Sequence, residues 1–344
     1  MNRIRIQASK EYDVCIGKGL LNQLGSLAAE VCKVQKAAII SDSHVWPLYG
    51  QAAKNSLEQA GFTVVNFVFP AGESSKNGAT YLSTLNFLAE NQLTRTDCII
   101  ALGGGVVGDL AGFAAATYLR GISYIQVPTT LLAAVDSSVG GKTAIDLPAG
   151  KNLAGCFYQP KLVVCDIDTL NTLPASIFRD GCAEVIKYGV LFDPALFVHL
   201  EHAGCAFDRE TVISRCVELK SAVVAEDEFD TGRRMLLNLG HTIGHGIEAG
   251  SNFNITHGQA VAIGMAIVTR SCGCADTQRI IGCLQRFGLP TETALSAQVL
   301  ADAALSDKKR SADTVQLILP ERIGKCTIAA TAVTQLLSFI EAGL

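Results

Sequence analysis

The sequence predicts an α/β fold in two parts: an N-terminal α/β domain with a parallel sheet (residues 1–169) and a mainly α-helical C-terminal domain (residues 170–344). Two observations predict this division. Short β-rich runs alternate with helical stretches in the first half, whereas long helical stretches follow residue 168. At 344 residues, with 49% hydrophobic and 17% charged residues, the chain can fill two cores and has little tendency to disorder.

The sequence predicts six strands and two helices in the N-terminal domain. Residues 1–6 form the expected opening strand. Further strands are predicted at 37–41, 63–69, 97–102, 123–127 and 162–165, with helices at 80–91 and from 105 towards 120. Strands and helices that alternate at this spacing imply a doubly wound parallel sheet, which binds ligands at the carboxyl ends of its strands.

The C-terminal domain reads as a set of helices with one late hairpin. The helices are predicted at 174–190, 194–202, 209–226, 234–249 and 259–272, and the hairpin strands at 315–319 and 325–328. The cleft between two domains is the usual place for a small-molecule site.

Charge and cysteine content exclude several classes of protein. Lys+Arg 28 against Asp+Glu 32 gives a net charge of −4, which argues against nucleic acid or an anionic membrane as a partner. No apolar run approaches the roughly 20 residues of a membrane span. The 12 cysteines contain no CxxC pair, and residues 1–6 do not resemble a signal peptide. We therefore expect reduced thiols and a cytoplasmic protein.

A cluster of histidines is the most informative feature of the C-terminal half. His241 and His245 are four residues apart and would share a helix face, while His257 opens a second apolar helix. Two interpretations remain open: a metal site between two helices, or buried histidines paired with carbonyl groups. Glycines at positions 240, 244, 246 and 258 favour close approach, because helix interiors otherwise disfavour glycine.

A glycine-rich turn follows the strand that ends at residue 102. Gly103, Gly105 and Gly108 satisfy the G-x-G-x-x-G spacing, which brings backbone N–H groups and a helix N-terminus to a pyrophosphate. The ribose-binding acid expected about 20 residues later is missing. The turn is therefore an unusual dinucleotide loop, a phosphate loop without a dinucleotide, or a turn that serves packing alone.

Glu184 and Lys187 lie three apart within an apolar stretch. A buried carboxylate needs a partner, which a simple Glu–Lys pair would provide. Alternatively, Glu184 joins two histidines in a His₂Glu zinc site.

These motifs together resemble the 3-dehydroquinate synthases over nearly the whole chain. The match follows Gly72-Glu-Ser-Ser-Lys76, the turn 103–109, Val127-Pro-Thr-Thr130, Lys151-Asn152, Ala183-Glu-Val-Ile-Lys187 and Asn238-Leu-Gly-His241. The resemblance implies a Rossmann-like domain that binds NAD, a helical domain with one divalent metal ion (zinc or cobalt), and a homodimer. It also implies conversion of 3-deoxy-D-arabino-heptulosonate 7-phosphate to 3-dehydroquinate and phosphate in the shikimate pathway.

The family pattern assigns roles to residues of this chain. It places the metal ion on Glu184, His241 and His257, where spacing alone selects His241 with His245. His245 would instead handle a proton close to the departing phosphate. The NAD contacts would be Glu73, Ser74, Ser75, Lys76, Gly105, Val106, Val107, Gly108, Asp109, Thr129, Thr130, Lys142, Lys151, Thr169, Leu170, Asn171 and Thr172. The substrate contacts would be Arg120, Asp136, Lys142, Asn152, Lys187, Lys220, Arg234, Asn238 and either Lys308 or Lys309.

Three alternatives to this assignment remain open. Another sugar-phosphate cyclase, of the 2-deoxy-scyllo-inosose or valiolone type, shares the cofactor loop and metal ligands but takes substrates without a carboxylate. A polyol dehydrogenase of the glycerol dehydrogenase type would accumulate NADH. A non-enzymatic nucleotide-binding regulator would leave the metal ligands and the lysines unexplained.

Overall fold

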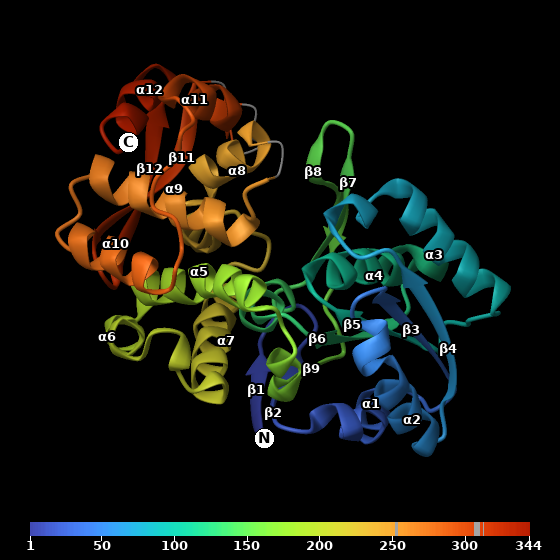
Figure 1. Ribbon diagram of the computed structural model, residues 1–344. Coiled ribbons are helices and arrows are strands. Elements are labelled where there is room, and N and C mark those ends of the chain that lie inside the picture. The colour runs from blue at the N-terminus through green and yellow to red at the C-terminus, as the bar shows by residue number, and fades with distance from the viewer. Residues whose placement is uncertain (252–253, 306–309, 312) are drawn as a thin grey trace. The chain divides into compact units, whose positions relative to one another are not determined.

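The computed structural model describes residues 1–251, 254–305, 310–311 and 313–344 (Figure 1). The chain forms two compact units. Unit 1 comprises Met1–Pro174 and Arg209–Phe229, and unit 2 comprises Ala175–Asp208 and Asp230–Leu344. Unit 1 thus includes residues 209–229, which the sequence-based division places in the C-terminal domain.

Unit 1 is built on a twisted sheet of seven described strands in the order β1-β2-β9-β6-β5-β3-β4. β1 is antiparallel to β2, and every other neighbouring pair is parallel. The strands are β1 (Asn2–Ile6), β2 (Tyr12–Gly17), β3 (Lys36–Asp42), β4 (Thr63–Phe69), β5 (Cys98–Gly103), β6 (Ser123–Pro128) and β9 (Leu162–Asp166).

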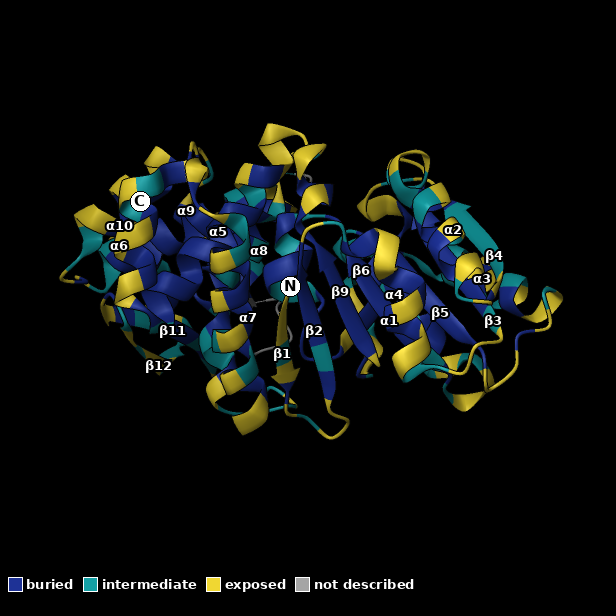
Figure 2. Cartoon of the chain, turned by 90° about the horizontal axis from the view of Figure 1, so that it is seen from below, coloured by how far each residue is buried: buried dark blue, intermediate teal, exposed yellow. Residues whose placement is uncertain are grey.

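Helices cover both faces of this sheet. The main ones are α1 (Leu24–Val31), α2 (Gln51–Gln59), α3 (Gly78–Glu90), α4 (Gly105–Thr117) and α7 (Arg209–Glu226). Alternating side chains of one strand enter two separate cores: Ile39 packs with α1 and α2, whereas Ile40 packs with α3 and α4. Figure 2 shows β5 and β9 as buried along most of their length, as expected for parallel strands that are covered on both sides.

A two-stranded hairpin and several short helices complete unit 1. The hairpin pairs β7 (Lys142–Leu147) with β8 (Gly150–Phe157) and packs against α4. The short helices are η1 (Leu20–Gln23), η2 (Trp46–Gly50), η3 (Glu73–Ser75), η4 (Tyr118–Arg120), η5 (Ala133–Ser137) and η6 (Ile167–Asn171).

Unit 2 is organised around the buried helix α9. Helices α5, α8, α10 and α12 and strand β11 all contact α9. The elements are α5 (Ala175–Phe192), α6 (Pro194–Ala203), η7 (Gly204–Ala206), η8 (Arg233–Asn238), α8 (His241–Gly250), α9 (His257–Ser271), α10 (Thr277–Arg286), α11 (Ala297–Leu305), β10 (Arg310–Ser311), β11 (Thr314–Arg322), β12 (Lys325–Ala332) and α12 (Val333–Glu341). The strands form an antiparallel sheet in the order β10-β11-β12.

The predicted fold class is confirmed, but one local prediction is wrong and several strands are not predicted. The continuous helix expected at 234–249 is broken into η8 and α8, because Gly240 adopts a left-handed conformation (φ 78°) at the junction. The sequence patterns do not predict strands β2, β7 and β8, and β1 makes one edge pair of the sheet antiparallel. The hairpin predicted at 315–328 is present as β11 and β12.

In the part of the chain that the structure describes, no helix is both long enough and apolar enough to cross a membrane.

Candidate functional site

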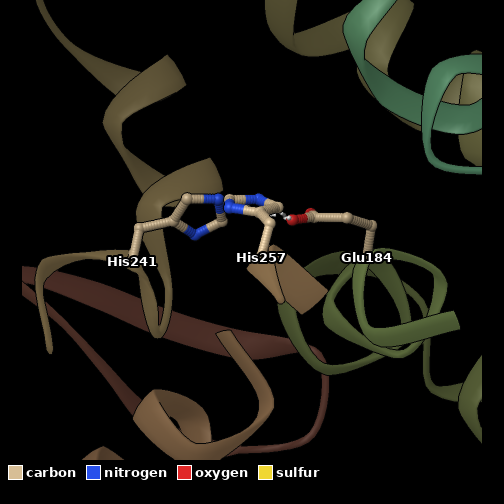
Figure 3. Close-up of side chains that lie close together, drawn as sticks. All are labelled: Glu184, His241 and His257. Atoms are coloured by element: carbon tan, nitrogen blue, oxygen red, sulfur yellow. Dashed lines mark hydrogen bonds and ion pairs between the residues drawn. The ribbon is translucent and has the colours of Figure 1, made fainter. Parts of the chain in front are cut away.

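Three side chains from three helices of unit 2 converge on one point. Glu184 comes from the middle of α5, and His241 and His257 are the first residues of α8 and α9. One ligand atom from each residue lies within 4.8 Å of the other two. Figure 3 shows the two imidazoles and the carboxylate pointing toward one another. Elsewhere in residues 1–251, 254–305, 310–311 and 313–344, no other group of three such side chains converges in this way.

Both imidazoles have one ring nitrogen engaged and direct the other at Glu184. His241 Nδ1 lies 3.1 Å from the carbonyl oxygen of Leu239, and His257 Nδ1 lies 2.8 Å from Glu248 Oε1. The Nε2 atoms lie 3.4 Å and 3.2 Å from Glu184 Oε1. An acceptor at Nδ1 orients each ring so that its Nε2 faces Glu184, an arrangement that is usual for metal-binding histidines.

Glu184 is completely buried, and its charge is compensated locally. Lys187, one helical turn further along α5, makes an ion pair with Glu184 Oε2, although that oxygen accepts no hydrogen bond of normal geometry. Burial opposes the charge of Glu184, but Lys187 and His241 outweigh it and hold the pKa of this carboxyl well below its usual range. Glu184 is therefore an ionised carboxylate with a spare acceptor position.

The two histidines have opposite pKa shifts. Burial and the nearby charge of Lys187 lower the pKa of His241 to about 4, so this ring is neutral at pH 7. Burial also opposes the charge of His257, but hydrogen bonds to Glu184 and Glu248 outweigh burial and raise its pKa to about 10. The position between the two carboxylates thus favours a positive charge.

Glycines allow the histidine-bearing helices to approach. A Cβ added to Gly264 of α9 would lie 2.0 Å from the carbonyl oxygen of Gly240. A Cβ added to Gly244 would lie 3.1 Å from the carbonyl oxygen of Ala260. The expectation that the glycines at 240 and 244 mark a close approach is borne out, because α8 begins against the backbone of α9.

Four further predicted residues lie on neighbouring elements of unit 2. His245 lies one turn after His241 with the ring centroids 5.7 Å apart, and its ring centroid is 6.5 Å from that of His257. Arg234 and Asn238 belong to η8, and the Arg234 side chain is 2% exposed. Lys187 is 1% exposed. Two buried cations in one unit indicate anionic partners.

The glycine-rich turn of unit 1 forms a strand-to-helix junction of the predicted kind. β5 ends at Gly103 and α4 begins at Gly105. The N-cap residue is Gly104, so no side chain caps the first amides of α4. A Cβ added to Gly103 would lie 2.5 Å from Val107, and one added to Gly104 would lie 3.0 Å from Thr130. The hydroxyl of Thr129 is buried beside this turn and makes no hydrogen bond. These features leave donors available at a helix N-terminus.

Lys76 connects three of the predicted cofactor- and substrate-binding segments. Its ammonium group lies 2.6 Å from Asp109 Oδ2 and donates to Asn152 Oδ1, and the side chain is 5% exposed. Glu73 lies 3.9 Å from both Lys76 and Lys151. Burial raises the pKa of Asp109 more strongly than Lys76 lowers it. Residues that are distant in the chain therefore share one charged network.

The other predicted residues of unit 1 fall into separate groups. Lys220 of α7 pairs with Asp136 of η5, donating to its carboxylate and, at 2.7 Å, to its carbonyl oxygen. The segment 169–172 is held by Tyr49, whose hydroxyl donates to the carbonyl oxygen of Thr169 at 2.8 Å. Lys142 and Arg120 are exposed. Arg120 also has a positive φ of 66°, an unusual conformation for a residue other than glycine.

Sequence reasoning missed two carboxylates that contact His257 or its helix. Glu248 accepts from the His257 ring, and Asp180 of α5 accepts from the backbone of Gln259 in the first turn of α9. Glu248 lies seven residues after His241, a helical spacing that could have indicated it. No local signal points to Asp180, because its partners are distant in the sequence. Lys308 and Lys309 lie outside the described residues.

Two family models match most of the chain. Residues 66–180 match the family described as 3-dehydroquinate synthase N-terminal, and residues 181–310 match 3-dehydroquinate synthase C-terminal. The 3-dehydroquinate synthase of Pelobacter propionicus is 46% identical, with 95% of each chain covered. That of Streptococcus suis is 43% identical, with 96% of this chain and 97% of its own length covered.

Solved structures of sugar-phosphate cyclases share the fold over the full length. A 2-deoxy-scyllo-inosose synthase complexed with carbaglucose-6-phosphate, NAD+ and Co2+ superposes with a TM-score of 0.89 at 26% identity, covering 100% of both chains. The 2-epi-5-epi-valiolone synthase of Streptomyces hygroscopicus with NAD+ and Zn2+ gives 0.87 at 26% identity, with 98% of each covered. Because both family models match and relatives above 40% identity cover nearly all of it, the chain belongs to the 3-dehydroquinate synthase family.

Proposed function

We propose that this chain is a lyase that converts 3-deoxy-D-arabino-heptulosonate 7-phosphate to 3-dehydroquinate and inorganic phosphate, using bound NAD⁺ and one divalent metal ion. Membership of the family supports the overall reaction. The convergence of Glu184, His241 and His257 is the single observation that carries the assignment to these residues.

The donor set suits a divalent ion such as Zn²⁺ or Co²⁺. Two Nε2 atoms and one buried carboxylate form a three-ligand set of the kind that leaves coordination positions open for substrate. Glu184 Oε2, which lacks a normal hydrogen bond, has acceptor capacity to spare. When bound, the ion supplies a Lewis acid that stabilises negative charge developing on the substrate's ring oxygens.

The turn at 103–109 suits the pyrophosphate of NAD. The N-terminus of α4 offers backbone donors, and the unpaired Thr129 hydroxyl beside it offers another polar contact. Lys76 places its charge at this turn through Asp109, while Thr169 and Thr172 lie on the segment held by Tyr49. When bound there, NAD⁺ would supply a reversible hydride acceptor for oxidation of a substrate hydroxyl.

The remaining residues are proposed to bind the substrate and move its protons. Lys187, Arg234 and Asn238 in unit 2, and Arg120, Lys142, Asn152 and Lys220 in unit 1, supply cationic and amide groups for a phosphate and a carboxylate. Asp136, held by Lys220, would orient substrate hydroxyls. His245 would hold the proton that accompanies phosphate departure, because it lies beside the three-ligand group without belonging to it.

The activity test follows both products together. Purified protein with NAD⁺ and Co²⁺ or Zn²⁺ should release phosphate and 3-dehydroquinate in equal amounts from the heptulosonate phosphate, with no net formation of NADH. A sugar phosphate that lacks the carboxylate serves as the competing substrate. Preferential turnover of that compound would make the chain another sugar-phosphate cyclase, and accumulating NADH would make it a polyol dehydrogenase.

Two histidine variants separate metal binding from proton transfer. His257→Ala should lose the metal ion and turnover while NAD⁺ still binds, because it removes one of three ligands. His245→Ala should retain the metal ion but release phosphate more slowly, by about 10²–10⁴-fold if it is a general acid–base group. Metal content close to wild type in purified His257→Ala would contradict the ligand assignment.

A homodimer and a cytoplasmic location are further proposals, supported by the family resemblance. Light scattering of the purified protein and cell fractionation test them.

A further inference from the structure

His257 is restrained at both ends of its side chain. Its Nδ1 atom lies 2.8 Å from Glu248 Oε1, and its Nε2 atom lies 3.2 Å from Glu184 Oε1. Glu248 is 2% exposed and comes from α8, two helical turns after His241. His241 differs in this respect, because its Nδ1 faces the neutral carbonyl group of Leu239. The ring of His257 therefore has a carboxylate behind it, and the ring of His241 does not.

The backbone of His257 is restrained by a second carboxylate. His257 is the first residue of α9, and Thr256 is its N-cap. Asp180 Oδ1 accepts hydrogen bonds from the Thr256 hydroxyl and, at 3.1 Å, from the Gln259 amide. Gln259 in turn accepts from the Thr256 amide at 3.2 Å through its side-chain oxygen. An acidic group at this position also interacts favourably with the positive end of the helix dipole.

Asp180 belongs to α5, the same helix that carries Glu184. A Cβ added to Gly258 would lie 2.0 Å from the backbone oxygen of Asp180, so the first turn of α9 lies directly against α5 here. Asp180 therefore links the start of α9 to the helix of another ligand. The distance between His257 and Glu184 depends on this link, because both ends of it are fixed by hydrogen bonds or steric contact.

We propose that Asp180 and Glu248 are positioning residues that hold His257 as a metal ligand, Asp180 through the backbone and Glu248 through the ring. This inference rests on the metal site proposed above. A carboxylate behind a ligating imidazole fixes its orientation and strengthens it as a donor, and losing such support typically weakens metal binding about 10–100-fold. An ordinary helix cap would affect stability alone.

The test measures Co²⁺ binding to the full chain by titration and by the visible absorption spectrum of the bound ion. Asp180→Asn and Glu248→Gln each keep the shape of the side chain but remove the carboxylate. The matched control is Asp193→Asn. Asp193 caps α6 by accepting from the amides of Ala195 and Leu196, and it is not one of the three ligands. Melting temperature and NAD⁺ affinity are recorded for every variant.

Asp180→Asn and Glu248→Gln should each bind Co²⁺ about 10–100-fold more weakly than wild type, with an altered spectrum, while NAD⁺ affinity stays unchanged. Asp193→Asn should lower the melting temperature to a similar extent as Asp180→Asn but keep the wild-type Co²⁺ affinity and spectrum. If Asp180→Asn does not fold, Thr256→Val removes one donor to Asp180 and leaves the carboxylate in place. That variant should then weaken Co²⁺ binding relative to Asp193→Asn.

Two different failures are distinguishable. If wild-type protein binds no Co²⁺, or His257→Ala binds it equally well, the proposed metal site is wrong. If wild type binds Co²⁺ and His257→Ala does not, but the Asp180 and Glu248 variants match Asp193→Asn in affinity and spectrum, the positioning role alone is overturned.

Discussion

At the scale of single residues, Lys76 belongs to a family motif and also forms a buried ion pair. Its side chain is 5% exposed and its ammonium group lies 2.6 Å from Asp109 Oδ2. A buried cation of this kind needs its partner, because the cost of removing two charges from water is recovered only when they are paired. Lys76 therefore both stabilises unit 1 and sets the charge beside the turn at 103–109.

Replacing Lys76 by methionine tests this dual role. Lys76→Met leaves Asp109 buried without its cation and should lower the free energy of unfolding by about 3 kcal/mol. This value is at the lower end of the range for a broken buried ion pair, because Asp109 retains some exposure. The double variant Lys76→Met/Asp109→Asn should recover most of that loss, as measured by urea unfolding. A double variant no more stable than Lys76→Met would show that the pair is not the source of the effect.

Cys205 is predicted to be a reactive thiol with a measurable pH dependence. The hydrogen bond from Cys182, together with Arg179, outweighs burial and lowers the pKa of Cys205 to about 7. Because the thiolate is the nucleophile, alkylation by iodoacetamide should speed up as the pH rises and reach half its maximal rate near pH 7. Peptide mapping of the alkylated protein checks this, with Cys205→Ser as the control; a midpoint above pH 8 would contradict it.

At the scale of elements, the geometry of the three-ligand group depends on how closely α8 and α9 cross. This crossing contains Gly240, Gly244 and Gly264, where a Cβ would lie against the facing helix or its N-terminus. The same contact breaks the helix predicted at 234–249, since Gly240 turns the chain so that α8 starts at His241. The packing of α8 against α9, and not local helix propensity, thus decides where His241 lies.

A glycine substitution where α8 and α9 cross can be compared with one in α10 of the same unit. Gly264→Ala places a Cβ 2.0 Å from the Gly240 carbonyl oxygen and should cost about 1–3 kcal/mol of stability and weaken Co²⁺ binding, because α8 must move away. Gly282→Ala, in the interior of α10, meets nothing within 4 Å and should gain up to about 1 kcal/mol through better helix propensity. Thermal unfolding and Co²⁺ titration distinguish them; equal effects would refute the crossing argument.

At the scale of the whole molecule, the candidate groups are divided between two units. The three-ligand group and Arg234 belong to unit 2, whereas the glycine-rich turn and the Lys76 network belong to unit 1. We therefore expect unit 2 to bind the metal ion and unit 1 to bind NAD⁺. The two binding events can then be measured separately.

Metal binding should stabilise unit 2 in particular. At a Co²⁺ concentration about 100 times the Kd, mass action adds about 2.7 kcal/mol to the free energy of unfolding of the binding form. Hydrogen exchange should show the added protection in α5, α8 and α9, and chelation by EDTA should remove it. Equal added protection throughout α1, α2 and α3 would contradict a site confined to unit 2.

Sequence patterns predicted elements best where the chain is regular. The strands at 37–41, 63–69 and 123–127 were foreseen because buried parallel strands are continuous apolar runs. The hairpin of β7 and β8 was missed, because most of β8 is exposed and its first residues, Gly150, Lys151 and Asn152, resemble a loop. The break at Gly240 was missed because a left-handed glycine lies within a continuous helical pattern.

The chain's residues alone determined the alternation of strands and helices, the glycine-rich turn and the chemical types available for a site. They left His245 and His257 both open as partners of His241, and the family resemblance was needed to choose. Only the tertiary structure decided that Glu184 and His257 meet, that Glu248 and Asp180 support His257, and that Lys76 joins Asp109 to Asn152. The physical reason is that these contacts join residues far apart in the sequence, and their distances are set by close packing between elements, which no local pattern encodes.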